Sequence, residues 1–368
     1  MRLRHACNLK CIPAWVCLLA ALAAAGLRPE NSAASAERKA ANLFFSGHSL
    51  TDNPLPEYVA AIAKSQGAEI HWNQQNIPGS PIRVRSLGSG GWVGYSSGKN
   101  AHGQGLNVID ELRRPRTLGN SQRYDTLIIA ERHDLIGPLQ WEDSVRLLRH
   151  FHERLIDGNP EGTTYFYESW AGVADKNKPA EWIAYERAAS PMWQCIGTRI
   201  NTSLAAERRS DRIQPLPAGA ALASLVERAT QKPGLTGITA SSDRQTLNNI
   251  FSDDVHLTPL STYYIALVTF ATVYQRSPEG AWAPPEVKPE QAKLLQSLAW
   301  EQVRSKPSPW PLEKCRAVIT ESFCSTFWRF FGKPQEAPNC AAHFAKRDSS
   351  NPFHYDAATD ASYWLPAP

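Results

Sequence analysis

A serine and a histidine that are distant in the sequence have the settings that nucleophilic catalysis requires. Ser49 lies in a Gly-His-Ser-Leu stretch, directly after the apolar run that ends at Phe45, and His256 ends an Asp-Asp-Val-His stretch. A serine hydroxyl is a weak nucleophile, so it needs a base within hydrogen-bond reach, and the base needs an orienting group. Asp253, three residues before His256, is the candidate orienting acid. These residues predict a Ser-His-Asp triad that forms an acyl-enzyme.

The same residues also have simpler structural interpretations. Ser49 has the type and the place of a helix N-cap. His256 can cap a helix that begins near Thr258, and the adjacent Asp254 can orient the ring instead of Asp253. The residues alone leave these alternatives open.

Acyl transfer also needs hydrogen-bond donors aimed at the developing oxyanion, commonly backbone N–H groups near a helix start. The N–H of Ser49 and that of Gly79, in a Pro-Gly-Ser turn, are candidates. The alternative for Gly79 is that of an ordinary turn glycine.

The elements that must position these groups alternate between strand and helix. Apolar runs predict strands at 41–46, 68–72, 124–130, 163–168 and 212–216. Helical spacing predicts helices at 54–66, 104–114, 139–157, 179–206 (bent or split at Pro191), 218–231, 258–274 and 287–304. The segment 77–99, rich in Gly, Ser and Pro, predicts a long irregular loop.

This alternation predicts an α/β fold of three layers, a doubly wound, flavodoxin-like parallel sheet of about five strands. In such folds the site lies at the carboxyl ends of the strands. Ser49, Gly79 and His133 each follow a predicted strand, so we expect them at one edge of the sheet.

Residues 41–275 resemble the SGNH (GDSL-type) hydrolase superfamily. Its sequence blocks resemble residues 47–50 (Gly-His-Ser-Leu), 76–79 (Asn-Ile-Pro-Gly), 130–134 (Ala-Glu-Arg-His-Asp) and 253–256 (Asp-Asp-Val-His). The resemblance implies that Ser49 is the nucleophile, His256 the base and Asp253 the orienting acid. It also implies that Ser49 and Gly79 supply oxyanion N–H groups.

The chain departs from the family pattern at two positions. His48 replaces the Asp beside the serine, and His133 stands where the family has its oxyanion Asn. An imidazole N–H can donate a hydrogen bond, so His133 is a candidate third donor. The alternatives are a loop histidine and an oxyanion hole short of one donor, a loss that costs about 10²–10³ in rate.

The N-terminus has the pattern of a secretory signal peptide. A basic start, an apolar stretch over about 12–27 and an Ala-Ser-Ala end predict a leader at 1–36, and the alternative is an uncleaved anchor. Cleavage would leave 35 basic and 34 acidic residues, a net charge of +1 instead of +4. A near-neutral chain gives no electrostatic case for nucleic acid, and we expect no stable membrane anchor. The predicted location is secreted or periplasmic.

Four of the seven cysteines lie beyond this leader, at positions 195, 315, 324 and 340. In an exported protein they can form two disulfides with three possible connectivities. Because three of them lie late in the chain, we expect one bridge to stabilise the C-terminal part. The predicted organisation is a leader at 1–36, a hydrolase-like domain at 37–305 and a Cys-, Trp- and Pro-rich extension at 306–368.

Neither a metal nor another cofactor is expected. The histidines outside the motifs do not cluster with carboxylates; they are His71, His102, His150 and His152. Aromatic residues near the predicted site edge suit the apolar faces of sugars, although core or rim packing is the commoner role for any single one of them; they are Trp72, Trp92, Tyr95 and Trp170.

The sequence therefore predicts an exported serine esterase that acts on small-molecule or carbohydrate acyl esters, acetyl esters among them. One alternative is a polysaccharide O-acyltransferase with the same triad. The other is a non-catalytic carbohydrate-binding protein on a degenerate hydrolase fold.

Overall fold

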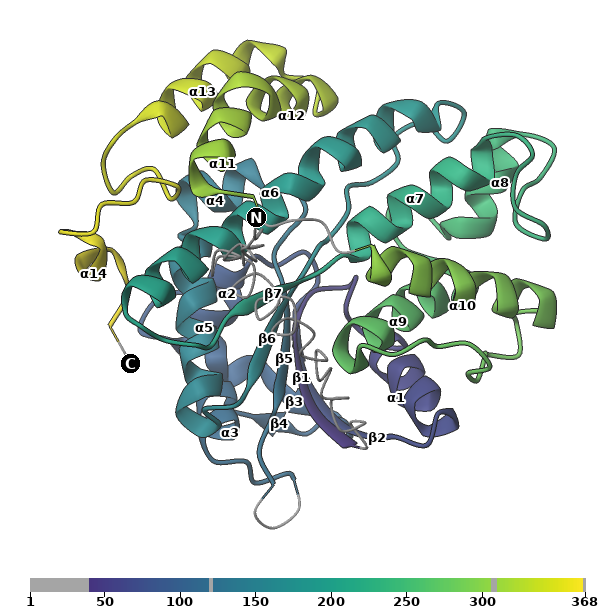
Figure 1. Ribbon diagram of the computed structural model, residues 1–368, viewed down its shortest axis with the longest axis horizontal. Coiled ribbons are helices and arrows are strands. Elements are labelled where there is room, and N and C mark those ends of the chain that lie inside the picture. Colours follow the sequence, from purple (N-terminus) through teal and green to yellow (C-terminus); the bar gives the residue numbers. More distant parts are fainter. Residues whose placement is uncertain (1–39, 119–121, 306–309, 367–368) are drawn as a thin grey trace, which may run out of the picture. The chain divides into compact units, whose positions relative to one another are not determined.

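The structure is a computed structural model of the chain that describes residues 40–118, 122–305 and 310–366 (Figure 1). The leader predicted at 1–36 lies outside these residues. Within the described ranges, no helix has both the length and the apolar character needed to cross a membrane.

A seven-stranded sheet forms the middle layer, in the order β4-β3-β2-β1-β5-β6-β7. Its strands are β1 (Ala40–Gly47), β2 (Glu69–Asn76), β3 (Gly98–Asn100), β4 (Gly105–Leu106), β5 (Thr126–Ala130), β6 (Thr163–Tyr167) and β7 (Ile213–Leu216). The five strands predicted from the sequence are the parallel ones, β1, β2, β5, β6 and β7. The prediction of about five strands was too low, because β3 and β4 add a short antiparallel edge within segments predicted as loop and helix.

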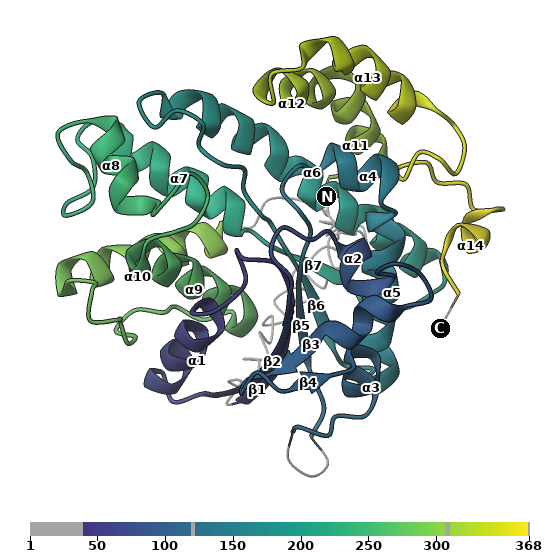
Figure 2. The same ribbon diagram turned by 180° about the vertical axis from the view of Figure 1, so that it is seen from behind.

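Helices cover both faces of the sheet (Figures 1 and 2). One face carries α1 (Leu55–Ser65), α7 (Ala218–Thr230), α8 (Asp243–Ile250), α9 (Pro259–Tyr274) and α10 (Pro289–Arg304). The other carries α2 (Ile82–Ser86), α3 (Val108–Arg113), α4 (Ile136–Trp141), α5 (Ser144–Gly158) and most of α6 (Pro179–Ala206). The α/β class expected from the alternation is therefore confirmed.

The central strands are apolar on both faces, as parallel strands between two helical layers must be. In β1, Leu43 and Phe45 face the layer of α1 and α9, whereas Phe44 faces that of α5. Ile128 and Ile129 of β5 divide in the same way. Burial of each such side chain contributes about 1.5–3 kcal/mol to stability.

Several predicted helices differ in detail. The helix predicted at 139–157 is two helices, because Asp143 adopts a left-handed conformation (φ 56°) between α4 and α5. In contrast, α6 runs unbroken through Pro191. Buried residues on both sides of that proline, such as Trp182 and Trp193, hold the helix in place against a cost of about 3 kcal/mol.

The C-terminal part is helical, although its sequence shows little periodicity. It contains α11 (Leu312–Val318), a π-helical turn (Ile319–Phe323), α12 (Cys324–Phe330), α13 (Ala337–Ala345) and α14 (Asp360–Tyr363). The four cysteines form two disulfides. The α6 bridge joins Cys195 to Cys315, and the α12–α13 bridge joins Cys324 to Cys340.

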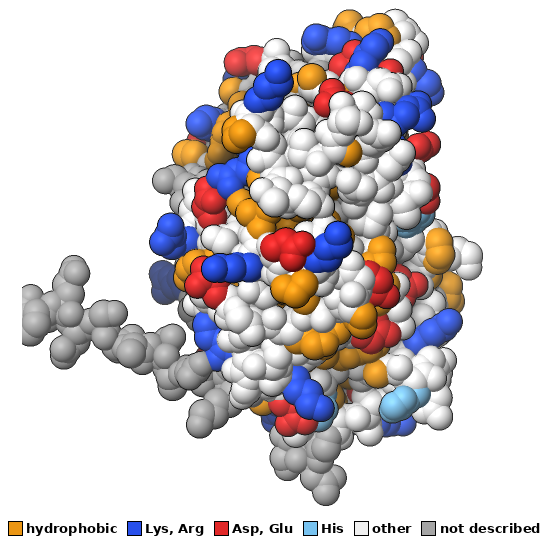
Figure 3. Space-filling model, turned by 90° about the vertical axis from the view of Figure 1, so that its right-hand side faces the viewer, with side chains coloured by type: hydrophobic (Ala, Val, Ile, Leu, Met, Phe, Trp, Pro, Cys, Tyr) orange, Lys and Arg blue, Asp and Glu red, His pale blue; other side chains and the backbone are white. Residues whose placement is uncertain are grey.

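Charges of both signs share the side of the molecule that carries α1, α7, α8 and α10 (Figure 3). Arg228 on α7 pairs there with Glu301 on α10. This side therefore offers no patch of a single sign of the kind that attracts nucleic acid.

Candidate active site

The candidate site lies where the chain order of the sheet reverses. Strand β1 stands between β2 and β5, and their carboxyl ends meet at one edge. Ser49 follows β1, Gly79 follows β2 and His133 follows β5. Ligands of doubly wound folds bind at such a switch point.

A tight turn presents Ser49 beyond the end of β1. The backbone N–H of Thr51 donates to the carbonyl of His48 (2.9 Å), and the Thr51 hydroxyl donates to Asn76 Oδ1 (2.8 Å). A Cβ at Gly47 would lie 2.0 Å from Thr51 Oγ1, so this turn requires the glycine. Ser49 does not cap α1, because the N-cap of that helix is Pro54.

The structure brings the three predicted triad residues together in one chain of hydrogen bonds. Ser49 Oγ lies 2.9 Å from His256 Nε2, and His256 Nδ1 lies 2.6 Å from Asp253 Oδ2. His256 does not cap α9, whose N-cap is Thr258. Asp254 does not contact the ring; its carbonyl accepts the backbone N–H of Val173 instead.

The two oxygens of Asp253 make different contacts. Oδ2 faces the imidazole, whereas Oδ1 accepts the backbone N–H groups of Val255 (2.8 Å) and His256 (2.6 Å). Partial burial raises the pKa of Asp253, but these hydrogen bonds to its charged form outweigh burial and lower the pKa to about 2. An ionised Asp253 keeps the ring proton on Nδ1, which leaves Nε2 free to accept the proton of Ser49.

The loop that carries His256 is fastened to the loop that follows β6. Trp170 Nε1–H donates to the carbonyl of Val255 (2.9 Å), and the backbone N–H of Val173 donates to the carbonyl of Asp254 (2.7 Å). The backbone N–H of Ser252 donates to the carbonyl of His256 (2.8 Å), which closes the turn. No sequence motif pointed to this role of Trp170.

The predicted oxyanion donors lie at the same edge but do not contact the triad side chains. The backbone N–H groups of Ser49 and Gly79 have no acceptor among the described residues, and Gly79 adopts a left-handed conformation (φ 65°). The half-buried ring of His133 makes no hydrogen bond to a described residue. Burial lowers the pKa of His133, with Asp134 opposing this and Arg132 adding to it, so the ring is neutral near pH 7.

His48, beside Ser49, is buried and connects the end of β1 to the ends of β5 and β6. The backbone N–H of Leu50 donates to its Nδ1 (3.4 Å), so Nε2 carries the ring proton. Nε2 lies 3.2 Å from the carbonyl of Glu131 after β5 and 3.2 Å from Ser169 Oγ after β6. Burial and the neighbouring Arg85 lower the pKa of His48 to about 3, so the ring is neutral.

A buried arginine beneath the site was not anticipated from the sequence. Arg85 donates to Ser46 Oγ (3.1 Å), to the carbonyl of Ser80 (2.7 Å) and to the carbonyl of Ala130. Burial lowers the pKa of Arg85 to about 10 and raises that of the neighbouring Glu131 to about 7, against the opposing effect of Arg85. Arg85 thus joins the ends of β1 and β5 to the turn that contains Gly79.

The four aromatic residues proposed as sugar platforms pack against the protein. Tyr95 is buried and stacks against Trp92, and Trp92 in turn stacks against His150. Trp72 packs against the core, and Trp170 is almost fully buried. Among the large hydrophobic residues of the described chain, Trp141 at the end of α4 is exposed instead, at 67%.

A cavity of about 140 Å³ opens beside the triad. Its lining combines Ser49 and His256 with residues of the β1–α1 loop and of α9; these are Leu50, Asp52, Asn53, Pro54, Leu55, Trp170, Leu257, Thr262 and Ile265. No group of His, Cys, Asp and Glu in the described part of the chain is arranged to hold a metal ion.

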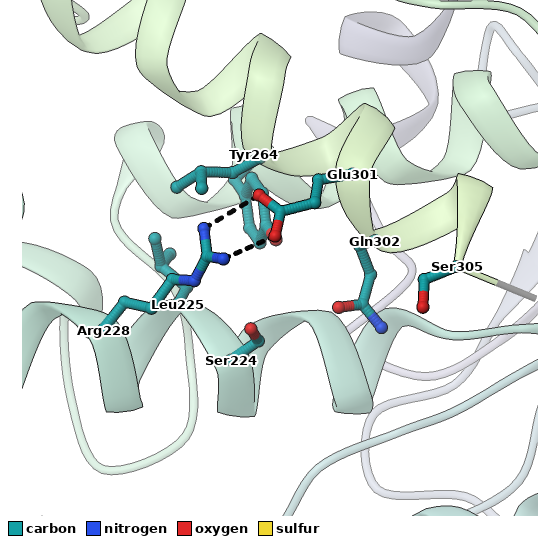
Figure 4. A pocket seen from close by; sticks show the side chains of 8 residues that line it. Ser224, Leu225, Arg228, Tyr264, Glu301, Gln302 and Ser305 are labelled. Atoms are coloured by element: carbon teal, nitrogen blue, oxygen red, sulfur yellow. Dashed lines mark hydrogen bonds and ion pairs between the residues drawn. The ribbon is translucent and has the colours of Figure 1, made fainter. Parts of the chain in front are cut away.

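A second cavity, of about 100 Å³, lies between α7, α9 and α10 (Figure 4). Arg228 and Glu301 pair across it through hydrogen bonds of 3.0 and 2.5 Å. Because its charged groups neutralise each other and its lining contains no histidine, it lacks the parts of a nucleophilic site.

Comparisons with known proteins leave the chain outside any matched family. No family model matches it, and no curated protein sequence matches it. The solved structure of a DUF4886 family protein from Bacteroides uniformis is similar to 73% of this chain and 98% of its own, with 14% identity and a TM-score of 0.49.

Proposed function

We propose that this protein is a serine ester hydrolase of the SGNH type with Ser49 as its nucleophile. The observation that carries the proposal is the continuous hydrogen-bond chain from Ser49 through His256 to Asp253. The first two residues are 207 positions apart in the sequence, so their contact is a product of the fold. The intact chain of contacts also weighs against a degenerate, purely binding role.

The geometry supports a two-step reaction. Ser49 Oγ attacks the acyl carbonyl while His256 Nε2 takes its proton, and the negative charge that develops on the carbonyl oxygen is held by the N–H groups of Ser49 and Gly79. In this proposal His133 supplies a third, neutral donor. His256 then protonates the departing alcohol, and a water molecule, activated by the same nitrogen, releases the acyl group from Ser49.

Two further observations are consistent with this proposal. The parallel strands run in the order 2-1-3-4-5 along the sheet, the order of flavodoxin-like folds, which agrees with the expected architecture. Two disulfides are typical of proteins that fold in an oxidising compartment, which agrees with an exported protein.

The test is hydrolysis of p-nitrophenyl acetate by wild type, Ser49→Ala and a control, Ser322→Ala, whose serine is exposed on the C-terminal helices. We expect a fall of at least about 10³ in kcat for Ser49→Ala, since one member of a triad is lost. The control should match wild type. Wild-type protein that is folded but has no activity above Ser49→Ala, across acetyl esters of nitrophenol and of sugars, would contradict the proposal.

A further inference from the structure

The cavity beside Ser49 has an apolar floor and a polar mouth. Leu50, Leu55, Trp170 and Ile265 are buried and form the floor. The reacting side chains of the proposed triad stand at the mouth, where residues are half-buried or exposed. A group bonded to Ser49 can therefore extend from the triad towards the floor.

The cavity and the candidate oxyanion donors are built from elements on different faces of the sheet. Its lining comes from the β1–α1 loop and α9, which belong to one face of the sheet. The loops of Gly79 and His133 lead into α2 and α4, which belong to the other face. A carbonyl oxygen directed at Gly79 and His133 therefore leaves the rest of the ester facing the cavity or the solvent.

We propose that this cavity binds the acyl chain and limits the enzyme to short, uncharged acyl groups; the inference rests on the proposed ester hydrolysis. Of the two remaining substituents of the carbonyl carbon, only the acyl chain can end in a closed space. The alcohol must stay next to His256 Nε2 to receive its proton, and a polymeric alcohol needs an open path to solvent. The buried apolar residues of the lining therefore suit the acyl chain.

The size of the cavity sets the length of the chain. A dry cavity of about 150 Å³ accommodates benzene. At about 140 Å³, this one accommodates acetyl to butyryl groups with room to spare and is filled by about six carbon atoms. Both Thr262 and Ile265 line the cavity, about one helical turn apart on α9, and Ile265 is buried whereas Thr262 is half-buried. In this proposal Ile265 therefore limits the length of the chain.

The charges at the mouth exclude acidic acyl groups. Asp52 lines the cavity, and no lysine or arginine does. An anionic chain such as succinyl would lose its hydration without gaining a cationic partner. We therefore expect p-nitrophenyl succinate to be hydrolysed at least about tenfold more slowly than the butyrate.

The test compares p-nitrophenyl acetate, butyrate, hexanoate and octanoate as substrates of the wild type, Ile265→Ala and Ile265→Phe. For the wild type, kcat/KM should fall at least about tenfold between butyrate and octanoate, since chain that does not fit is discriminated by about that factor. Ile265→Ala should raise the octanoate-to-butyrate ratio about tenfold, and Ile265→Phe should confine activity to acetate.

Leu267→Ala is the matched control, because Leu267 is equally buried on α9 but does not line the cavity. It should leave the ratio at its wild-type value. Ser49-dependent activity with the same ratio in all variants would overturn the cavity proposal and leave ester hydrolysis standing.

Absence of any Ser49-dependent hydrolysis would instead count against the proposed function. The cavity is then tested by nuclear magnetic resonance titration of Ser49→Ala with butyramide and octanamide. Shifts at cavity residues with butyramide alone, lost on adding Ile265→Phe, would support a short-chain pocket. No shift with either amide, or equal shifts with both, would overturn it.

Discussion

The different contacts of the two Asp253 oxygens predict the outcome of Asp253→Asn. The backbone N–H groups of Val255 and His256 need an acceptor, so the amide oxygen must take the place of Oδ1. The amide NH₂ then replaces Oδ2 and faces His256 Nδ1. A donor at that position forces Nδ1 to accept and moves the ring proton to Nε2, which can no longer receive the proton of Ser49.

The size of the effect follows from the tautomer and not from the loss of charge. Asp253 and His256 are 56% and 45% exposed, so even a fully charged pair would contribute only about 0.2–1 kcal/mol. A wrong tautomer enforced by the same exchange in a serine protease costs about 10⁴ in kcat. With water able to compete at this exposed site, we expect a loss of about 10³–10⁴, or about 4–5.5 kcal/mol in the barrier.

The assay is steady-state hydrolysis of p-nitrophenyl acetate near pH 7 by wild type, Asp253→Asn and Asp254→Asn. The second variant makes the same chemical change one residue away, where only the backbone carbonyl makes a contact, and should stay within about twofold of wild type. The unfolding midpoint should barely move in either variant. A loss below tenfold in Asp253→Asn, or an equal loss in Asp254→Asn, would refute the reasoning.

Three further outcomes are expected. As an oxyanion donor, His133 should be needed for ester hydrolysis, so kcat should fall about 10²–10³-fold in His133→Ala and be largely restored in His133→Asn. Equal kcat values for wild type and His133→Ala would refute that role. The folded state lowers the pKa of His48 from 6.5 to about 3, so the unfolded chain binds a proton that the folded chain does not, and the free energy of unfolding falls as the pH drops below 6.5. Between pH 7 and about pH 5, protonation of His48 in the unfolded chain should lower the free energy of unfolding by about 2 kcal/mol. Denaturant titrations of His48→Gln should not show this decrease, and an equal decrease in wild type and variant would contradict the assignment to His48. Replacing both cysteines of the α6 bridge by serine should lower the free energy of unfolding by about 4.9 kcal/mol, because that bridge closes a separation of 120 residues. The same change in the α12–α13 bridge, which closes a separation of 16 residues, should lower it by about 3.1 kcal/mol. A lower unfolding midpoint for the variant without the α12–α13 bridge would exclude loop closure as the cause.

The parts of the fold that the sequence predicted are those with strong local patterns. The run at 124–130 is apolar on both faces and became β5, and Gly47 before Ser49 marked a turn that has no room for a Cβ. Ser49, Gly79 and His133 were placed at one edge because parallel strands bring their carboxyl ends together, whereas His256 was assigned to Ser49 because a serine nucleophile needs a base. Those predictions required only periodicity, strand order and chemistry.

Other features depend on contacts that no local pattern records. Arg85 lies in the segment that was predicted only as an irregular loop, yet it is completely buried and donates to groups at the ends of β1 and β5. Tyr95 looked like a platform and is core, because its ring packs on Phe151 of α5. The C-terminal helices are short, and one contains a π-helical turn, so their spacing shows no regular period.

The C-terminal residues that pack against α6 are made long after the helix itself. Tyr185 stacks on Phe330 at 4.1 Å, Cys195 bonds to Cys315, and the buried guanidinium of Arg199 pairs with Asp360. During synthesis from the N-terminus, the strands and the triad are complete soon after residue 256, but Arg199 has no counter-ion until 161 residues after it have been made. A chain that ends just before residue 360 therefore contains every strand of the sheet and the proposed triad but leaves Arg199 on α6 without this partner. Residues from the end of the chain thus complete the packing of α6, the helix whose Tyr185 hydroxyl donates to the carbonyl of His133 beside the candidate site.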